Sequence, residues 1–282
     1  MKEIIGGTHT GERALFASCD LEITNAVFCD GESPLKESRD IRLSGCEFKW
    51  KYPLWYCEDI SAEMCVLDET ARSGIWYTKN ISMNNCNIKA PKTFRRSSDI
   101  SLLSVNISNA QETLWNCERV KLRDVFICGD YFGMGTCDVD ASDIVVEGNY
   151  IFDGGRNIVI RNSKLISKDA FWNCENVTVY DSVIVGEYLG WNSKNVTLIN
   201  CEIESNQGMC YIDNITLRNC KLTNTDLCFE YCTVDAEITS HVDSIKNPKS
   251  GKIVADSIGE IILEPEFVDV TKTEVSEVKN AV

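Results

Sequence analysis

Apolar residues recur along this chain at intervals of 19 to 21 residues, and this pattern determines the predicted fold. The repeat can be anchored on an apolar residue that usually follows an Asp or Asn, and thirteen such anchors lie between Leu21 and Ile253. Each anchor is followed by apolar or small residues two, five and seven positions later, as Val196 is followed by Leu198, Cys201 and Ile203. The anchor and the residue two positions later form one alternating pair, and the residues five and seven positions later form another. The spacing between the two pairs breaks the alternation, which indicates two short strands that meet at a bend.

The bend falls four residues after the anchor, where short polar residues recur. Asn and Asp tolerate the left-handed backbone conformation that a one-residue corner requires. A third strand is expected just before each anchor. Three strands in about nineteen residues describe one coil, so the sequence predicts an all-β, single-stranded, right-handed parallel β-helix of about 13 coils. The corner residues are Asn25, Asn85, Asp124, Asp143, Asn162, Asp181, Asn200 and Asn219.

The repeat also predicts how the chain is organised. Each coil stacks on its neighbours, and no Pro/Gly-rich linker interrupts the register, so we expect residues 1–282 to form a single β-helix domain. Within it, residues 1–13 are the expected N-terminal cap and residues 14–263 the coils. Residues 264–282 form a polar C-terminal tail that covers the last coil or is partly disordered.

The composition disfavours some classes of partner and indicates a cellular compartment. The formal net charge of −15 disfavours nucleic acid and anionic membranes, because both favour basic surfaces. No apolar stretch reaches the length of a membrane span, and the segment that follows Met1 lacks the apolar core of a signal peptide. We therefore expect a cytoplasmic protein with no nucleic-acid or membrane partner.

Fifteen cysteines need an explanation in such a chain. Several share one inward column, so the favoured interpretation is a ladder of buried free thiols. Disulfides between adjacent coils and a metal site remain alternatives. Since no CxxC, P-loop or GxGxxG motif occurs, we expect no metal and no cofactor. The inward column comprises Cys46, Cys65, Cys86, Cys201 and Cys220.

Aromatic residues gather five positions before the anchor, where five of the six tryptophans lie. In one interpretation these rings point inward and fill the core. In the other they line a lateral groove in which rings stack on sugars and neighbouring polar side chains bind hydroxyl groups. The ligand-binding candidates beside this column are Tyr52, Tyr56, Tyr77, Tyr131, Tyr150, Tyr188, Asn116, Asn173 and Asn192.

Charged residues on the same face supply catalytic candidates. Equivalent side chains lie roughly 5 Å apart on adjacent coils and roughly 10 Å apart two coils away. Carboxylates at such spacings suit glycoside hydrolysis, and a basic group beside a uronate suits β-elimination. The alternative is a ladder of surface ion pairs. The candidates are Lys92, Arg95, Arg96, Glu112, Asp130, Asp153, Asp169 and Glu187.

The two histidines, His9 and His241, lie near opposite ends of the repeat array. This disfavours a Ser/His/Asp or Cys/His site, although a site in a terminal cap stays open.

Several longer segments resemble a known group of sequences. The chain resembles a family of uncharacterised bacterial proteins, grouped as a domain of unknown function, that look like right-handed β-helices of the pectin-lyase type. The resemblance implies the fold and implies no activity or catalytic residue. The segments that carry it are GERALF (11–16), GESPLKES (31–38), YPLWY (52–56), APKTFRR (90–96), KDAFWN (168–173), GEYLGWN (186–192) and NPKSG (247–251).

The sequence supports two functional hypotheses. The first is a β-helix that binds an oligosaccharide or other polyhydroxylated ligand along the aromatic and charged face. If the protein is an enzyme, it also processes that ligand. An enzyme would belong to the polysaccharide lyase or glycoside hydrolase class. The second is a non-enzymatic scaffold that binds another protein or a second copy of itself as a homo-oligomer.

Overall fold

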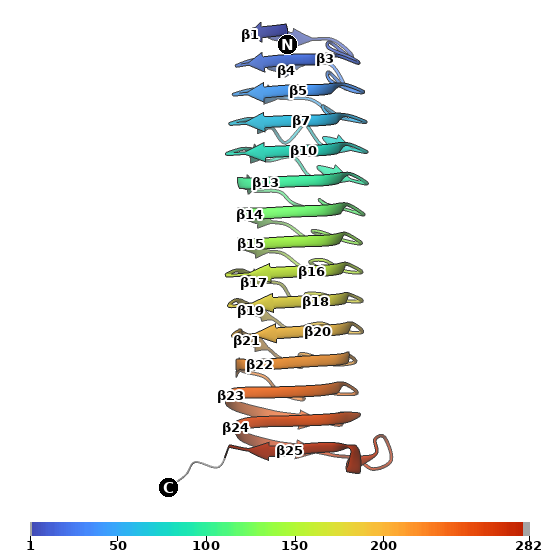
Figure 1. Ribbon diagram of the computed structural model, residues 1–282, viewed down its shortest axis with the longest axis vertical. Helices are drawn as coiled ribbons and strands as arrows, with labels where there is room; N and C mark the ends of the chain where they lie inside the picture. The colour runs from blue at the N-terminus through green and yellow to red at the C-terminus, as the bar shows by residue number, and fades with distance from the viewer. Residues whose placement is uncertain (1, 279–282) are drawn as a thin grey trace. The chain divides into compact units, whose positions relative to one another are not determined.

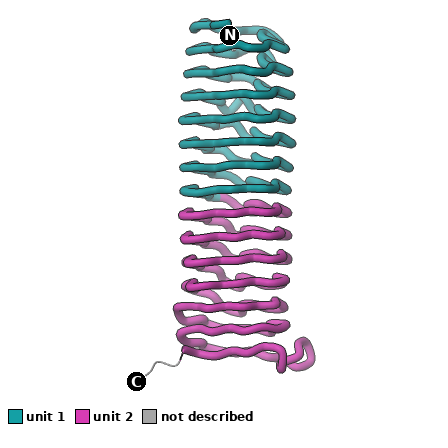
Figure 2. Tube along the Cα trace, viewed as in Figure 1, with its two compact units in different colours: residues 1–147 teal, residues 148–282 magenta. Residues whose placement is uncertain are grey.

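The computed structural model describes residues 2–278 and divides into two compact units, unit 1 (residues 1–147) and unit 2 (residues 148–282) (Figure 2). Both units are built from parallel strands stacked coil upon coil, with each strand paired to its equivalent in the next coil (Figure 1). The fold is therefore the predicted parallel β-solenoid with a spacing of about nineteen residues.

Unit 1 has one continuous column of parallel strands, which begin its coils, and a second column after the corner. The first column contains β1 (Lys2–Ile5), β3 (Cys19–Thr24), β5 (Arg39–Ser44), β7 (Glu58–Glu63), β10 (Lys79–Asn84), β13 (Ser98–Ile107), β14 (Glu118–Cys128) and β15 (Cys137–Glu147). The second contains β2 (Thr8–Thr10), β4 (Val27–Cys29), β6 (Glu47–Phe48), β8 (Val66–Leu67), β11 (Asn87–Ile88) and the ends of β13, β14 and β15.

Unit 2 repeats this arrangement. Its strands are β16 (Arg156–Arg161), β17 (Lys164–Ile166), β18 (Glu175–Tyr180), β19 (Val183–Gly186), β20 (Lys194–Ile199), β21 (Glu202–Ser205), β22 (Asp213–Thr223), β23 (Thr233–Lys246), β24 (Ser250–Ile262) and β25 (Thr273–Glu277), with one short 3₁₀ helix at Val270–Lys272.

The first column has eight coils in unit 1 and seven in unit 2, which makes fifteen rather than thirteen. The two additional coils are β1, in the expected cap, and β25, in the expected tail; each pairs with its neighbour but lacks the full apolar pattern. The final anchor is also displaced, since Ile253 pairs with Ala236 while Gly251 takes the place opposite Val234. A Cβ at Gly251 would lie 1.8 Å from the carbonyl oxygen of Val234. The expectation of a single domain stays a prediction.

The predicted corners are confirmed by their backbone angles. The Asn and Asp residues four positions after the anchors have φ between 49° and 57°. A second left-handed corner precedes the anchor, and there the side-chain amides form a ladder from Asn214 to Asn195 (2.9 Å) and from Asn195 to Asn176 (2.9 Å). This ladder gives the Asn in front of the anchor a structural role.

The expected third strand is nearly absent from the described residues. Only β9 (Ile75–Trp76) and β12 (Phe94–Arg95) form regular strands there. Backbone hydrogen bonds still join the coils, as from the Tyr56 N–H to the Trp76 carbonyl at 2.9 Å. Left-handed residues such as Tyr56 and Tyr77 interrupt extended structure, because their φ angles are 55° and 57°.

The anchors are buried, and so are the inward positions that follow them in the coils from Leu21 to Ile215 and the cysteines of the inward column. The fifteen cysteines all lie within the described residues and are free thiols. In the inward column the sulfurs point at main-chain carbonyls, as from Cys46 Sγ to the Ile23 oxygen (3.3 Å). Burial raises the pKa of the Cys57 and Cys174 thiols to about 12. These thiols therefore pack as small apolar groups.

Residues 2–278 lack two further features. No group of three or more His, Cys, Asp or Glu side chains there is arranged to hold a metal ion. No helix in this part of the chain is long and apolar enough to cross a bilayer.

Candidate functional site

The tryptophan column lies outside the fully buried core, and its five rings are half-buried. In unit 1 the Trp55 and Trp76 rings stack with centroids 5.1 Å apart and planes 8° apart. The Arg95 guanidinium continues the stack, 4.7 Å from the ring centroid of Trp76 and 4.5 Å from that of Trp115. The interpretation that the tryptophan rings point inward and fill the core is therefore wrong. The rings cover the core from outside.

Hydrogen bonds also fix the indoles of unit 1. The Nε1–H of Trp55 donates to the Ser73 carbonyl (2.5 Å), and that of Trp76 donates to the Lys92 carbonyl (2.8 Å). The Nε1–H of Trp115 donates to the Tyr131 carbonyl at 2.7 Å. Both the ring faces and the N–H groups of this stack are thus occupied by the protein itself.

A second ladder runs beside the tryptophans of unit 1. The Tyr56 and Tyr77 rings stack at 4.8 Å with planes 5° apart. Lys36 lies over the Tyr56 ring at 5.6 Å, and Arg96 lies over the Tyr77 ring at 5.9 Å. Tyr52 packs against the tryptophan column, 4.5 Å from the Trp55 ring. These predicted ligand-binding rings mainly contact one another and nearby cations.

Two of the three basic candidates near residue 95 share one carboxylate. Glu112 Oε2 lies 3.1 Å from Lys92 Nζ and 3.3 Å from Arg95 Nη2. Asp130 accepts a backbone hydrogen bond from Glu112 N (3.0 Å) through its carbonyl, and the ring of the following Tyr131 is exposed. In unit 1, Lys92, Arg95 and Glu112 thus form ion pairs of the kind that was the alternative interpretation.

The aromatic residues of unit 2 are arranged differently. The Tyr150 and Trp172 rings meet at 87° and 5.7 Å, and the Tyr188 and Trp191 rings meet at 72° and 5.3 Å. The Trp172 and Trp191 rings are tilted by 50° at 6.0 Å. These three pairs are tilted or edge-on, whereas the Trp191 ring stacks on the Tyr211 ring at 5.2 Å with planes 15° apart.

Asp169 lies at the centre of this region and is 2% exposed. Among the described residues, three buried polar atoms here have no hydrogen-bond partner: Asp169 Oδ2, Trp172 Nε1 and Ser167 Oγ. Burial raises the pKa of the Asp169 carboxyl; the Lys168 charge opposes this rise and the Glu187 charge adds to it. Unpartnered buried polar atoms are costly, so each of these three carries an unmet hydrogen-bonding capacity.

Glu187 lies on the next coil and differs from Asp169 in its surroundings. Lys168 Nζ is 3.4 Å from Glu187 Oε2 and lies over the Tyr188 ring at 5.6 Å. A hydrogen bond with the Glu187 carboxylate raises the pKa of Tyr188. We call the group Tyr150, Ser167, Asp169, Trp172, Glu187 and Tyr188 the Asp169 cluster.

The predicted asparagines and Asp153 belong to a corner ladder. Asn192 Nδ2 donates to Asn173 Oδ1 (2.8 Å), and Asn173 Nδ2 donates to Asp153 Oδ1 (2.9 Å). Asn116 lies at an equivalent left-handed corner, with φ of 51°. These side chains therefore stabilise corners.

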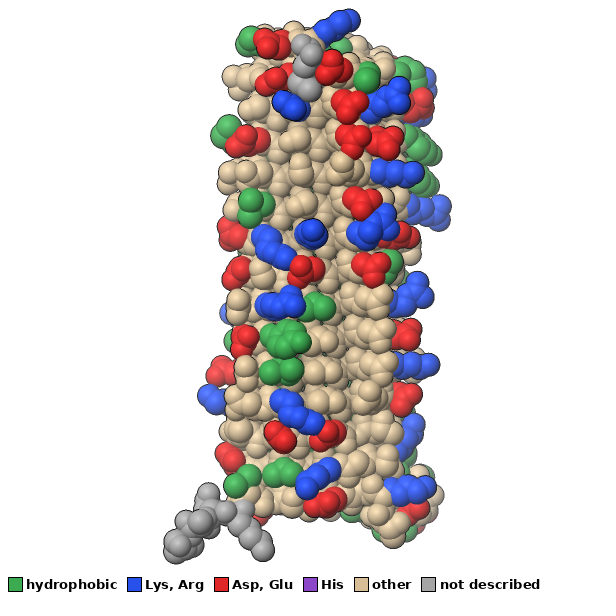
Figure 3. Space-filling view, viewed as in Figure 1, with side chains coloured by type: hydrophobic (Ala, Val, Ile, Leu, Met, Phe, Trp, Pro, Cys, Tyr) green, Lys and Arg blue, Asp and Glu red, His purple; other side chains and the backbone are tan. Residues whose placement is uncertain are grey.

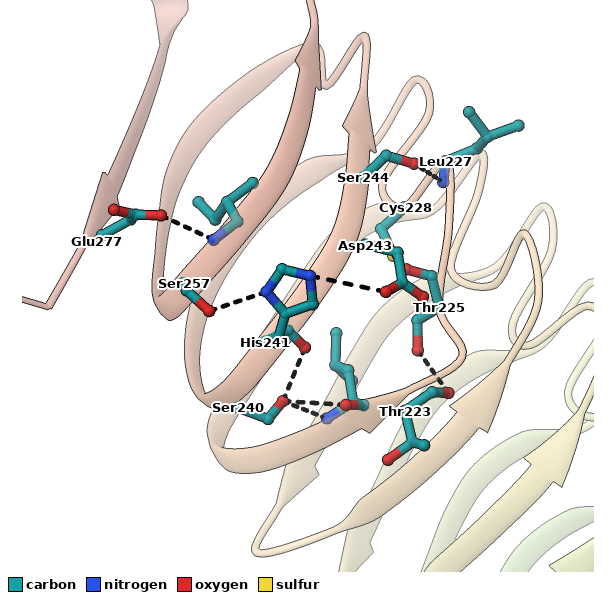
Figure 4. Close-up of polar contacts among 12 residues, drawn as sticks. Thr223, Thr225, Leu227, Cys228, Ser240, His241, Asp243, Ser244, Ser257 and Glu277 are labelled. Carbon is teal, nitrogen blue, oxygen red and sulfur yellow. Dashed lines mark hydrogen bonds and ion pairs between the residues drawn. The ribbon is translucent and has the colours of Figure 1, made fainter.

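The C-terminal histidine lies in a polar group of its own (Figure 4). His241 Nδ1 is 2.8 Å from Ser257 Oγ, and His241 Nε2 is 3.7 Å from Asp243 Oδ1. The second distance is too long for the hydrogen bond by which a catalytic carboxylate orients its imidazole, and the side chains of His241 and Asp243 are about half exposed. The arrangement is a surface contact. His9 stacks on Phe28 at 5.1 Å.

The sequence-based reading missed a shallow channel on the strand face of unit 1. Two adjoining cavities of about 480 Å³ and about 250 Å³ share Asn80. Their floor includes Ser61, Ser82 and Ser101, each of which directly follows an apolar anchor. The recurrence of Ser at this outward position was the signal available in the sequence.

The sequence matches, over residues 2–276, the family described as "Protein of unknown function (DUF3737)". No curated protein matches it.

Among solved structures, a tailspike protein mutant of E. coli bacteriophage HK620 in complex with a pentasaccharide is 9% identical, with 98% of this chain and 70% of that chain covered and a TM-score of 0.38. PfbA, a surface adhesin of Streptococcus pneumoniae, is 8% identical, with 91% and 83% covered and a TM-score of 0.42. The A-module of the Azotobacter vinelandii mannuronan C-5 epimerase AlgE4 is 10% identical, with 98% and 87% covered and a TM-score of 0.35. Likenesses this distant assign no function.

Proposed function

The chain belongs to the family described as Protein of unknown function (DUF3737), and we propose that it binds an oligosaccharide or similar polyhydroxylated ligand at the Asp169 cluster of unit 2. The observation that carries the proposal is the set of three buried polar atoms without partners, on Ser167, Asp169 and Trp172. Leaving each such atom unsatisfied costs about 1–3 kcal/mol. A ligand whose hydroxyl groups donate and accept hydrogen bonds would offset that cost.

The aromatic rings support a sugar in particular. Tyr150 and Trp172 meet edge-on at 87°, and Trp172 is tilted by 50° from Trp191, so the Trp172 ring has no parallel stacking partner in these two pairs. Binding sites for small ligands typically combine such apolar surface with a few polar groups that fix orientation. Two carboxyl groups, of Asp169 and Glu187, disfavour an anionic ligand here, so the proposed ligand is neutral.

The same two carboxyl groups suit acid–base chemistry. Burial raises the pKa of the Asp169 carboxyl and so favours its neutral form, whereas Glu187 forms an ion pair with Lys168. Glycoside hydrolysis uses such a pair: one carboxyl group gives a proton to the glycosidic oxygen, and the other activates water or attacks the sugar. If the protein hydrolyses the bound oligosaccharide, Asp169 would be the general acid and Glu187 the general base or the nucleophile.

A binding screen tests the proposal. Neutral oligosaccharides on an array are offered to the purified chain, and hits are titrated by intrinsic tryptophan fluorescence. We expect a saturable hit whose affinity falls at least tenfold in Asp169→Ala. The matched control is Asp181→Ala, since Asp181 is an exposed corner carboxylate that accepts from Asn200 at 2.9 Å. A folded wild-type chain with no hit, or equal affinities in the two variants, contradicts the proposal.

The scaffold function and the homo-oligomer stay predictions. A concentration-independent monomer mass, measured by light scattering, would count against self-association.

A further inference from the structure

The outward strand face of unit 2 has an apolar centre. On β18 the outward residues are Thr178 and Tyr180, on β20 they are Thr197 and Ile199, and the two strands pair them in register. All four are half-buried, while the residues that alternate with them are buried in the core. Parallel sheets are usually covered on both faces, so an apolar centre on an outward face suits contact with another surface.

The strand position of Tyr180 and Ile199 is mostly polar in unit 1. Ser44 on β5, Glu63 on β7 and Asn84 on β10 occupy it and pair in register. Leu103 on β13 is an isolated exception, between Asn84 and Arg123. The coils therefore do not require large apolar residues at this position, and their succession in unit 2 is a local feature.

The charges on this face change sign from one end of unit 2 toward the other. Arg161 on β16 pairs in register with Tyr180, and its guanidinium lies over the Tyr180 ring, 5.4 Å from the centroid. At the other end, β23 presents the exposed carboxylates of Asp235 and Glu237. Arg218 on β22 forms an ion pair with Asp235 and lies 4.0 Å from Glu237, so two carboxylates meet one cation there. Figure 3 looks onto the strand face, and in its lower half basic side chains flank the hydrophobic ones, with acidic side chains below them.

A face with a basic end, an apolar centre and an acidic end is complementary to itself. When a two-fold axis parallel to the strands relates two such faces, the order of the strands is reversed in the second copy. With the axis at β20, Ile199 meets Ile199 of the second copy, and Tyr180 meets Arg218. Because β16 and β23 each lie two coils from β20, Arg161 then meets Glu237. These contacts join apolar groups, a ring with a cation, and opposite charges.

We propose that the strand face of unit 2 binds the same face of a second copy of this chain, through β16, β18, β20, β22 and β23. Five strands at roughly 4.8 Å and about six residues at roughly 3.3 Å give a face of about 24 Å by 20 Å. Two such faces bury about 1,000 Å², which is the lower limit for a specific interface. The dimer is therefore weak, and its population depends on concentration.

This surface is separate from the Asp169 cluster and does not rest on it. The residues of the cluster lie outside the five strands that form the proposed interface. Each proposal can therefore fail while the other holds.

The test is sedimentation velocity of the purified chain over a wide range of concentrations. We expect the average mass of the wild-type chain to rise from monomer toward dimer. Ile199→Lys places two like charges against each other at the two-fold axis, so it should raise the dimer dissociation constant at least tenfold. The matched control is Leu103→Lys, which makes the same kind of exchange at an exposed position of unit 1 and should leave that constant unchanged.

A charge exchange tests the two-fold arrangement itself. Arg161→Glu and Glu237→Arg should each weaken the dimer at least tenfold, because each sets like charges against each other, and the double variant should recover most of the wild-type affinity. A double variant as weak as the single variants would overturn the proposal. A folded wild-type chain that stays monomeric at every concentration, or a dimer that Ile199→Lys leaves intact, would also overturn it.

Discussion

The guanidinium of Arg95 lies 4.5 Å from the ring centroid of Trp115. It is also held by Glu112 at 3.3 Å, so a residue that looks basic and catalytic in the sequence is committed to a stack. A cation over an indole contributes about 0.5–2 kcal/mol, depending on how far it is desolvated. The side chains on the lateral face of unit 1 therefore stabilise the fold, which the sequence pattern alone does not reveal.

Replacing that guanidinium should destabilise the fold. Arg95→Met keeps a flexible apolar side chain but removes the cation and its ion pair, so we expect a loss of about 1–2 kcal/mol in unfolding free energy. Chemical denaturation measures it. Arg39→Met is the control, because Arg39 is exposed. An equal effect of the two substitutions would contradict the structural role of the stack.

The raised pKa of Asp169 predicts how stability depends on pH. Since burial raises the folded-state pKa above the unfolded value, the carboxyl group favours folding only while it is protonated, and this contribution is lost as pH rises through the folded pKa. Asp169→Asn should therefore raise the melting temperature at pH 7, and the gain should shrink as pH falls toward the usual Asp range. Thermal melts across this range test the sign. A gain that grows on acidification would refute it.

Thiol reactivity should follow burial. Cys19 is exposed, whereas burial raises the pKa of Cys57, Cys117 and Cys174 to about 12. We expect the fastest native-state reaction with a thiol reagent to be lost in Cys19→Ser, slower reaction of the half-buried Cys29, Cys128 and Cys137, and reaction of the buried thiols only on unfolding. Fast labelling of Cys57 in the native chain would contradict the buried-ladder description.

The asparagine ladder separates a backbone effect from a side-chain effect. Asn195 has φ of 54° and its amide is bonded on both sides at 2.9 Å. Asn195→Gly keeps the backbone angle but loses the amide ladder, and Asn195→Ala loses the ladder and also strains the corner by about 1–2 kcal/mol. Alanine should therefore be the more destabilising in thermal melts. The reverse order would show that the corner conformation is not what Asn195 provides.

The sequence predicted the coils and their corners because both follow from local rules. An inward side chain such as Val196 and a left-handed corner such as Asn200 recur every nineteen residues, and stacking converts that period directly into structure. Side-chain contacts on the surface do not follow from the period. Trp115 and Trp172 occupy equivalent positions, yet the indole of Trp115 donates to Tyr131 and that of Trp172 has no partner among the described residues.

The same limit explains what was missed about the candidate sites. Asp169 was among the candidates, but its burial depends on neighbouring coils, which no spacing rule specifies. The serine channel was not predicted, because a single small polar residue at an exposed strand position of one coil gives no signal. Its meaning depends on the register that brings Ser82 between Ser61 and Ser101.

A matched pair of tryptophan variants tests the central claim most directly. Trp172→Phe and Trp115→Phe each remove one indole N–H and keep an aromatic ring, and both variants are titrated with the neutral oligosaccharide that binds the wild-type chain best. We predict that Trp172→Phe weakens binding about tenfold, because in the proposed complex its unpartnered N–H donates to the ligand, while Trp115→Phe lowers stability and leaves affinity unchanged. Equal affinities in both variants, or a loss confined to Trp115→Phe, would contradict a ligand site at the Asp169 cluster.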